Sequence, residues 1–337
     1  MRSRRRSAIP RGQGELALIR RIRRHFPEGT ANGVTLGIGD DCALLRIRPG
    51  EEAAVTTDLS IEGRHFKLNL HPPEAIGHRA LARGLSDVAA MGARPVAAFL
   101  SLGVPSSLTR PGSSRASSWI DCFFDGFLSL ARKHKTPLAG GDLAQSPLAV
   151  ADIVLIGVVP RGKALLRSGA RPGDFIYVTA SLGGSAFGLR RLRSRRSESG
   201  DLSAHLWPQP RIPQGLWLQR RNVASAAIDI SDGLSTDLHH LCDESKVAAE
   251  INTESLPIFP GANLEDALHG GEDYELLFTA RAGARVPRSI AGVPVTRIGS
   301  ITKARRGGFA VTLTDSSGIK RALHPRGWEH FRVAKPE

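Results

Sequence analysis

The sequence is poor in cysteine, in aromatic residues and in long apolar runs. Its three cysteines, Cys42, Cys122 and Cys242, include no C-x-x-C pair, which excludes a disulfide framework and predicts a reducing compartment. The longest apolar stretch, residues 153–160, is far too short to cross a bilayer. No apolar segment of a secretory signal follows the basic N-terminus before Glu15. We therefore expect a cytoplasmic protein with no membrane partner.

Aromatic residues make up 5 % of the chain, so its cores have to be built mainly from Ala, Val, Leu and Ile. The hydrophobic content of 41 % and the charged content of 23 % are ordinary for a globular protein. A chain of 337 residues is long for a single hydrophobic core and long enough to form two domains.

The balance of charge is strongly basic, with a formal net charge of +14. Much of the excess lies in residues 2–6 and 190–196, which are flanked by Ser and Gly and contain no aromatic residues. Such runs are typical of solvated tails and loops, so we predict no specific nucleic-acid partner. A nucleic-acid-binding protein remains the alternative from a different class, and it would show salt-sensitive affinity without ATP turnover.

Helical and strand-like patterns alternate in both halves, which favours an α/β (α+β) fold with two domains. We predict a disordered basic tail over residues 1–13, an N-terminal domain over 14–158 and a C-terminal domain over 159–337. Predicted helices span residues 15–25, 74–91, 118–134, 183–190 and 233–244. Predicted strands span residues 34–38, 53–57, 95–104, 149–159, 174–179, 226–230, 274–279 and 293–301. Residues 191–210 are predicted to form a polar insertion, and residues 140–142 a loop.

Acidic residues recur at predicted strand ends and beside glycines. They lie in residues 39–41, 56–58, 86–87, 140–142, 229–233 and 270–273. Carboxylates are the ligands that Mg²⁺ prefers, and neighbouring glycines let backbone N–H groups approach phosphates. Each segment alone is also typical of a turn, and Asp232 could be the N-cap of the helix over 233–244. The set together predicts Mg²⁺-assisted phosphoryl transfer from ATP, although the sequence has neither a P-loop nor a protein-kinase glycine-rich loop.

Six segments in this order resemble the thiamine-monophosphate kinase family of the aminoimidazole-ribonucleotide-synthetase-like superfamily. They are residues 36–43, 57–66, 85–93, 140–142, 229–234 and 270–276. The resemblance implies ATP-dependent phosphorylation of thiamine monophosphate to thiamine diphosphate, by direct in-line transfer assisted by several Mg²⁺ ions. It also implies a homodimer, in which the N-terminal mixed-sheet domain binds ATP and Mg²⁺ and pairs with its copy, while the C-terminal domain binds the substrate.

The resemblance also implies a role for individual residues, and it implies no general base, because the acceptor phosphate is already a nucleophilic anion. The implied metal ligands are Asp41, Thr56, Thr57, Asp58, Asp87, Asp142, Asp229 and Asp232. The implied ATP contacts are Gly140, Gly141, Arg167 and Ser231, and the implied substrate contacts are His65, Glu272 and Trp328. A purely structural role remains an alternative for four of these residues: a surface arginine for Arg167, an ordinary surface or core histidine for His65, a turn carboxylate for Glu272 and a hydrophobic plug that closes the domain for Trp328.

The chain departs from the family pattern at Gly84, where Asn is usual, and at Leu143, where Thr is usual. Two other enzymes of the superfamily remain as alternatives, aminoimidazole ribonucleotide synthetase and selenophosphate synthetase. The second would need a reactive Cys in a glycine-rich N-terminal segment, whereas Cys42 lies inside the acidic motif.

Overall fold

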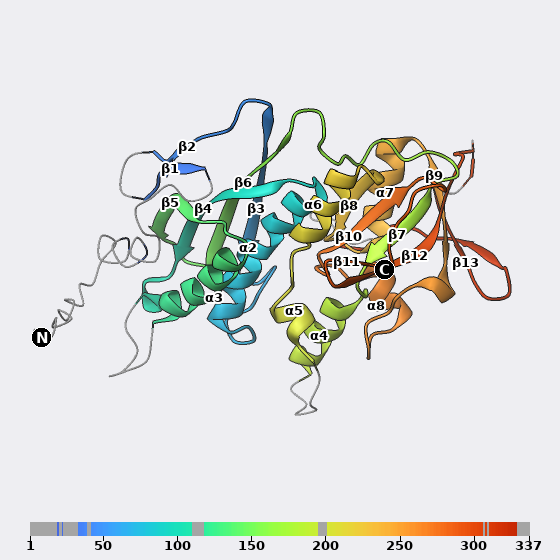
Figure 1. Ribbon diagram of the computed structural model, residues 1–337. Coiled ribbons are helices and arrows are strands. Elements are labelled where there is room, and N and C mark those ends of the chain that lie inside the picture. Colours follow the sequence, from blue (N-terminus) through green and yellow to red (C-terminus); the bar gives the residue numbers. More distant parts are fainter. Residues whose placement is uncertain are drawn as a thin grey trace, which may run out of the picture.

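The computed structural model describes residues 19, 22, 33–38, 42–109, 118–194, 201–305, 307–308 and 310–328. The predicted tail, the larger part of the helix predicted over residues 15–25 and the candidate ligand Asp41 lie outside these residues. Ile19 and Ile22 are both helical. The chain forms two α/β halves placed side by side, each built on its own mixed sheet (Figure 1). This confirms the predicted fold class.

The N-terminal sheet has the strand order β3-β6-β4-β5. These strands are β3 (Glu51–Ile61), β6 (Val150–Pro160), β4 (Arg94–Val104) and β5 (Leu138–Gln145), and a short pair of β1 (Val34–Leu36) and β2 (Leu44–Leu45) precedes them. Only β4 and β5 run parallel, so the sheet is mixed. Helices α2 (Pro73–Ala90) and α3 (Trp119–Lys133) cover one of its faces (Figure 1). A reciprocal capping box between Ser118 and Asp121 starts α3, as expected for a Ser three residues before an acidic residue.

The C-terminal sheet has the order β14-β13-β9-β12-β7-β10-β8. Its strands are β7 (Phe175–Thr179), β8 (Ala224–Ile230), β9 (Ala248–Asn252), β10 (Glu275–Ala280), β12 (Val293–Thr302), β13 (Val311–Thr314) and β14 (Lys320–Ala322), with β11 (Ser289–Ile290) paired to β12. Its helices are α4 (Gly184–Arg193), α5 (Ser203–Leu206), α6 (Ile212–Arg221), α7 (Leu234–Ser245) and α8 (Leu264–His269). Single 3₁₀ turns occur at Ser106–Leu108 and Thr253–Ser255.

Helix α2 joins the two halves, because it is buried against elements of both. Its residues Leu81 and Leu85 belong to a core cluster that also contains Leu276 and Phe278 of β10. A second cluster lies under β7 to β10 and α7 and includes Leu238 and Ile298. Because α2 contacts β3, β6 and β8, its polar residues are held where the two sheets meet.

The structure corrects four local predictions. Residues 140–142 are not a loop but part of β5, and Asp58 lies inside β3 rather than after it, because each strand is longer than its apolar pattern. The segment predicted as a polar insertion contains the end of α4 and the whole of α5. Arg190, predicted in a solvated run, makes two hydrogen bonds to the Asp266 carboxylate, because α4 lies against α8. The domain limit at residues 158 and 159 stays a prediction.

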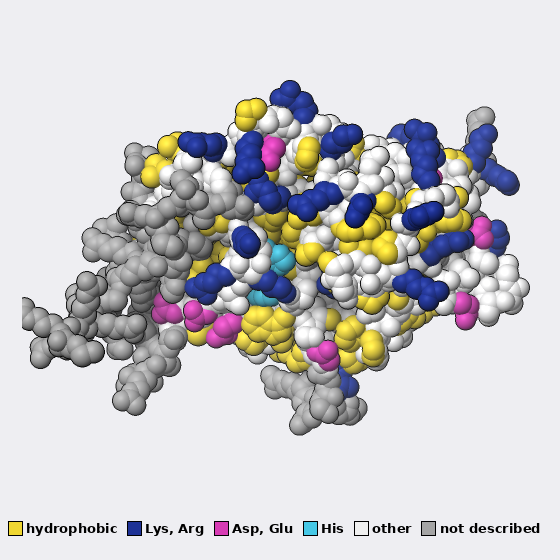
Figure 2. All heavy atoms as spheres, viewed as in Figure 1, with side chains coloured by type: hydrophobic (Ala, Val, Ile, Leu, Met, Phe, Trp, Pro, Cys, Tyr) yellow, Lys and Arg dark blue, Asp and Glu magenta, His cyan; other side chains and the backbone are white. Residues whose placement is uncertain are grey.

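Lys and Arg side chains are spread over the upper part of the face in Figure 2, from the N-terminal to the C-terminal half, with apolar and other surface between them. Among the described residues, no helix has the length and apolar character needed to cross a membrane.

Candidate functional site

Helix α2 carries three charged side chains toward the junction of the two halves. Arg79, Arg83 and Asp87 follow one another at four-residue spacing, which places them on one face of the helix. The Arg83 guanidinium forms a two-pronged ion pair with Asp58 of β3, at 2.8 Å from Nε to Oδ2 and 2.7 Å from Nη2 to Oδ1. Arg79 donates to Glu272 at 2.7 Å from Nη2 to Oε2. The helix thereby fixes two of the predicted site carboxylates, one from each half.

Two further predicted ligands, Asp87 and Asp229, lie together beside this ion pair. The Thr56 hydroxyl donates to Asp87 Oδ2 at 2.5 Å, and the Ser86 hydroxyl donates to Asp229 Oδ2 at 2.7 Å. Burial and, after it, the nearby charge of Asp87 raise the pKa of Asp229 to about 7. Burial also raises the pKa of Asp87. Two crowded, poorly hydrated carboxylates repel each other, and a hard divalent cation relieves that repulsion.

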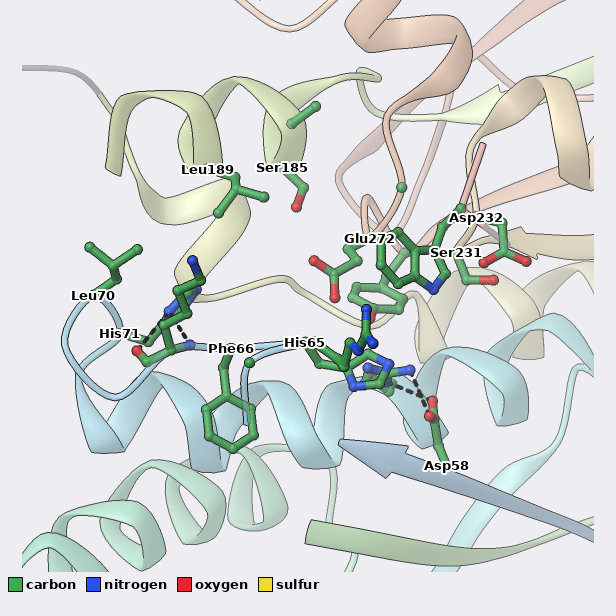
Figure 3. Close-up of a pocket in the computed structure, with 18 of the residues that line it drawn as sticks. Asp58, His65, Phe66, Leu70, His71, Ser185, Leu189, Ser231, Asp232 and Glu272 are labelled. Carbon is green, nitrogen blue, oxygen red and sulfur yellow. Dashed lines mark hydrogen bonds and ion pairs between the residues drawn. The ribbon is translucent and has the colours of Figure 1, made fainter. Parts of the chain in front are cut away.

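A cavity of about 280 Å³ opens on this centre from the side of α4 and the loop after β3. Figure 3 shows its labelled side chains converging from both halves of the chain. Eight of the predicted site residues line it: Asp58, His65, Asp87, Asp229, Ser231, Asp232, Glu272 and Trp328. We call this cavity the acceptor pocket.

A second cavity of about 270 Å³ adjoins the same centre from the other side. Its lining includes Thr56 and Arg167, and it shares Asp87 and Asp229 with the acceptor pocket. Arg167 is exposed, and its charge lowers the pKa of both aspartates against the effect of burial. The two cavities therefore meet at this pair of carboxylates.

Glu272 and Tyr274 are held in an unusual backbone conformation at the acceptor pocket. Their φ angles are +67° and +53°, in the left-handed region that side chains other than glycine rarely adopt. Backbone N–H groups of Glu272 and Tyr274 donate to the carbonyls of Ser231 and Ile230, which holds this loop against the end of β8. Burial raises the pKa of Glu272, but nearby positive charges, that of Arg79 first and that of Arg83 among them, together with the hydrogen bond from Arg79 lower it to about 2. Glu272 is therefore an ion-paired carboxylate rather than a simple turn residue.

The loop from Ser231 to Gly233 is ordered by Asp237 of α7. One oxygen of Asp237 accepts the backbone N–H groups of all three loop residues, at 3.0 to 3.1 Å. The N-cap of α7 is Gly233, so the alternative role of Asp232 as N-cap is wrong. Oxygen atoms of Asp232 and Asp237 and a ring nitrogen of His240 lie within 4.8 Å of one another and could hold a cation at the edge of the site.

His65 and Trp328 reach the acceptor pocket from opposite ends of the chain. The backbone N–H of Ile61 donates to His65 Nδ1 at 3.0 Å, which orients the ring beside the end of β3. The backbone N–H of Trp328 donates to the carbonyl of Asp232, and its half-exposed indole borders the cavity. The structure therefore brings all three predicted substrate contacts into one cavity.

Gly140, Gly141 and Asp142 lie in a different place. They line a separate cavity of about 590 Å³, together with Ile38 and Cys42 on either side of the undescribed residues 39–41. In the sheet register, Asp58 is opposite Ile153, Ile153 opposite Leu100, and Leu100 opposite Gly141. Three strand spacings, about 14 Å, separate Asp58 from Gly141. The structure does not bring Asp142 to Asp87 and Asp229.

Thr57 also lies apart from its neighbours in sequence. Alternate residues of a strand face opposite sides of a sheet, and the exposed side chain of Thr57 is on the face away from Thr56 and Asp58. Gly141 has a φ of +147°, and a Cβ atom there would lie 2.0 Å from the carbonyl oxygen of Leu100. The glycine is therefore required by the close approach of β4 and β5.

Sequence reasoning missed several residues of the site, which are Arg79, Arg83, Ser86, Ser185, Leu189 and Arg193. The spacing of Arg79, Arg83 and Asp87 along a predicted helix was a signal that could have found the two arginines. Among the α4 residues, Arg193 lies past the helix end predicted at residue 190, and nothing in the sequence linked Ser185 and Leu189 to the acidic segments.

Comparisons with known proteins agree with this geometry. Residues 39–159 match the family described as "AIR synthase related protein, N-terminal domain", and residues 171–312 match the corresponding C-terminal domain. The thiamine-monophosphate kinase of Escherichia coli (strain K12) is 39 % identical over 336 residues, covering 94 % of this chain and 98 % of the relative. The chain belongs to the thiamine-monophosphate kinase family. It is accordingly a phosphotransferase, as its relatives are.

Solved structures of thiamine-monophosphate kinases share the fold. The crystal structure from Stenotrophomonas maltophilia K279a has a TM-score of 0.75 and 38 % identity, covering 88 % of this chain and 95 % of that chain. The structure described as "AaThiL complexed with AMPPCP and TMP" has a TM-score of 0.72 and 30 % identity, covering 97 % of this chain and all of that chain. That relative holds two ligands at once, and two cavities meet at the carboxylate centre of this chain.

Proposed function

We propose that this chain transfers the γ-phosphoryl group of ATP to thiamine monophosphate and forms thiamine diphosphate. The observation that carries the proposal is the pair of cavities that share Asp87 and Asp229. One cavity offers an exposed arginine suited to nucleotide phosphates, and the other offers an indole and an ion-paired carboxylate suited to a cationic heteroaromatic acceptor. The names of the relatives and the two ligands of a similar structure support the same reaction.

The donor set fits several Mg²⁺ ions. Asp87, Asp229 and Asp232 present carboxylate oxygens and Thr56 a hydroxyl oxygen, all of the hard type that Mg²⁺ prefers. When bound, the ions would neutralise phosphate oxygens of both ligands and so reduce their mutual repulsion. Asp58 could join them through its outer lone pairs while it stays paired to Arg83.

The residues of the chain then have to position the two ligands in line. Arg167 would hold the nucleotide phosphates in the second cavity, and Ser231, which lines the acceptor pocket, would contact the phosphate that is transferred. His65, Glu272 and Trp328 would hold the acceptor. No side chain has to remove a proton, because the acceptor phosphate is ionised at neutral pH, and direct transfer follows from alignment and charge.

We further propose that the active form is a homodimer, paired through the N-terminal sheets. The face of β3 away from α2 exposes Val55 by 62 % and Leu59 by 44 %. Half-buried Val154 and Ile156 continue this apolar face on β6. A second copy of the chain would cover this face. That copy would also bring another Gly140–Asp142 segment near the face. The predicted ATP and metal contacts of residues 140–142 therefore belong to the dimer proposal.

The dimer has a direct test. Leu59→Lys should convert a particle of twice the chain mass into one of single mass in sedimentation or light scattering, because a charge would be placed on the covered face. A wild-type chain of single mass at micromolar concentration contradicts the dimer. The cytoplasmic location remains a prediction from the sequence.

One coupled assay tests the reaction. ADP release with ATP, Mg²⁺ and thiamine monophosphate should be fast, and unphosphorylated thiamine should give none, because the acceptor has to be a phosphate. Asp232→Asn should lower turnover by orders of magnitude with little change in thermal unfolding. Turnover with the acceptor of aminoimidazole ribonucleotide synthetase or of selenophosphate synthetase instead, or nucleic-acid affinity without ATP turnover, would overturn the proposal.

A further inference from the structure

A buried polar cluster lies behind the acceptor pocket, between α2, α4 and α5. It consists of His71, Arg79, Ser185 and His205, none of which is more than 4 % exposed. Burying polar groups is unfavourable unless every group is hydrogen-bonded, and apolar side chains would fill the same space at lower cost. A buried polar cluster next to a cavity therefore indicates a functional role in that cavity.

The cluster forms a chain of contacts that ends at Ser185. His71 Nε2 lies 3.0 Å from His205 Nε2, and His205 Nδ1 lies 3.0 Å from the Ser185 hydroxyl. Arg79 donates to the backbone carbonyl of His205 and so holds the backbone from which the imidazole extends. Burial, followed by the charge of Arg79, lowers the pKa of both histidines, that of His205 to about 3. Both rings are therefore neutral at pH 7, so they do not repel each other and each keeps one N–H and one lone pair.

The sequence of α4 places the hydroxyl. Gly188 faces α5, and a Cβ atom there would lie 2.7 Å from the Cβ of His205. The missing side chain lets α5 pack directly on α4, which brings the imidazole of His205 to Ser185. Ser185 and Leu189 are four residues apart, so they share a face of the helix, and both line the acceptor pocket.

The acceptor pocket has two chemically different ends. In Figure 3, Asp58, Ser231 and Asp232 lie at one end, and Phe66, Leu70, His71 and Leu189 lie at the other. Lys67 and Arg193 also line the cavity, and Arg193 is close enough to His71 to lower its pKa, so the second end is mixed, with an apolar part formed by Phe66, Leu70 and Leu189. The oxygen of Ser185 points into the space between them. In the proposed reaction, the acceptor phosphate has to lie at the carboxylate end to meet the nucleotide. Its organic part must then extend toward the second end.

We propose that the apolar part of the second end, formed by Phe66, Leu70 and Leu189, holds the aminopyrimidine ring of thiamine monophosphate, and that the Ser185 hydroxyl hydrogen-bonds the amino edge of that ring. The inference rests on the proposed function. His205 uses one of the three hydrogen-bonding positions of the hydroxyl, which leaves two for a ligand in the pocket. His205 is thus a positioning residue that acts through Ser185.

The first experiment is steady-state kinetics of Ser185→Ala. The KM for thiamine monophosphate should rise roughly tenfold, the factor that corresponds to about 1.4 kcal/mol, while kcat and the KM for ATP stay within about twofold. Ser203→Ala, which removes an exposed hydroxyl from α5, is the matched control and should change neither constant. An unchanged KM for the acceptor, or a raised KM for ATP instead, overturns the inference.

An acceptor analogue identifies the contacted atom. When oxygen replaces the pyrimidine amino group of thiamine monophosphate, the wild-type KM should rise roughly tenfold, and in Ser185→Ala the two acceptors should have equal KM values. An equally large preference for the natural acceptor in the variant overturns the assignment. Absence of wild-type turnover with thiamine monophosphate would refute the proposed function itself, and the two failures are therefore distinguishable.

Substitutions at His205 separate positioning from mere filling of space. His205→Phe keeps the ring volume but loses both nitrogens, and it should reproduce the KM effect of Ser185→Ala. His205→Asn keeps a polar group near the Nδ1 position and should restore a KM within about threefold of wild type. Wild-type KM in the Phe variant overturns the role of His205, and if that variant does not fold, Ser185→Ala still decides the inference.

Discussion

Replacing Asp229 by Asn should raise the stability of the metal-free protein while it abolishes activity. Asp229 is 3 % exposed, and burial together with Asp87 raises its pKa from an ordinary 3.8 to about 7. A rise of about three pKa units corresponds to about 4 kcal/mol of unfavourable free energy for the charged form. The Asn side chain can still accept the hydrogen bond from Ser86, so the substitution removes the charge and little else.

The effect should depend on pH in a defined direction. Between about pH 4 and pH 7, the folded protein keeps a proton on Asp229 that the unfolded chain has released, so stability falls as the pH rises through this range. The cost is fully present above pH 7 and absent below about pH 4. Asp229→Asn should therefore stabilise the protein most at pH 8 and progressively less toward pH 5.

Thermal unfolding in EDTA at pH 5 and at pH 8 measures this difference. With Mg²⁺ and ATP added at pH 8, wild type should gain stability and the variant should gain far less, because a ligand carboxylate is missing. Asp243→Asn, an exposed substitution on α7, is the control for loss of one negative charge. Equal unfolding midpoints for wild type and variant at both pH values, or near-normal turnover in the variant, would refute the reasoning.

Three further predictions concern other parts of the molecule. Glu272→Gln should lower the free energy of unfolding by about 3–5 kcal/mol in denaturant titrations at pH 7, because the buried Arg79 guanidinium would lose its charged partner. The difference between wild type and variant should shrink as the pH falls toward 2, where Glu272 itself becomes protonated. An unchanged free energy of unfolding at pH 7 would contradict the ion pair. Gly141→Ala should lower the unfolding midpoint clearly, since its Cβ would collide with a neighbouring carbonyl, and a wild-type midpoint would show that β5 can shift. Deletion of residues 1–12 should leave kcat within about twofold of wild type in the ADP assay, because these residues contribute no predicted ligand, and a large loss would assign the tail a part in catalysis.

Much of the fold follows from local patterns. The apolar repeats over residues 74–91 and 118–134 became α2 and α3 within one or two residues, because each helix buries a continuous stripe. The apolar run over residues 149–159 became β6, the central strand whose two neighbours cover both of its edges. Strand ends were less predictable: β3 continues past Thr57 to Ile61 because its pairing with β6 stabilises residues that alternate in polarity.

The site was predictable where short segments carry their own geometry. Asp87 and Asp229 follow from a helix and a strand packed together, whereas the distance between Asp58 and Asp142 depends on sheet register, which no local pattern specifies. His205 was missed because a four-residue helix in a polar segment has no periodicity to detect. Its role depends on Gly188, which lies 17 residues earlier in the sequence and matters only once α4 and α5 are in contact.

The four-residue spacing on α2 sets a fixed length within the enzyme. Arg79 anchors the loop at the acceptor side and Asp87 marks the carboxylate centre, and eight residues of helix separate them by about 12 Å. Since a hydrogen-bonded helix hardly stretches, the distance between the Arg79–Glu272 ion pair and the Asp87 carboxylate is fixed. Inserting one residue between Arg79 and Asp87 would turn one of them by about 100° and so remove it from its present partner.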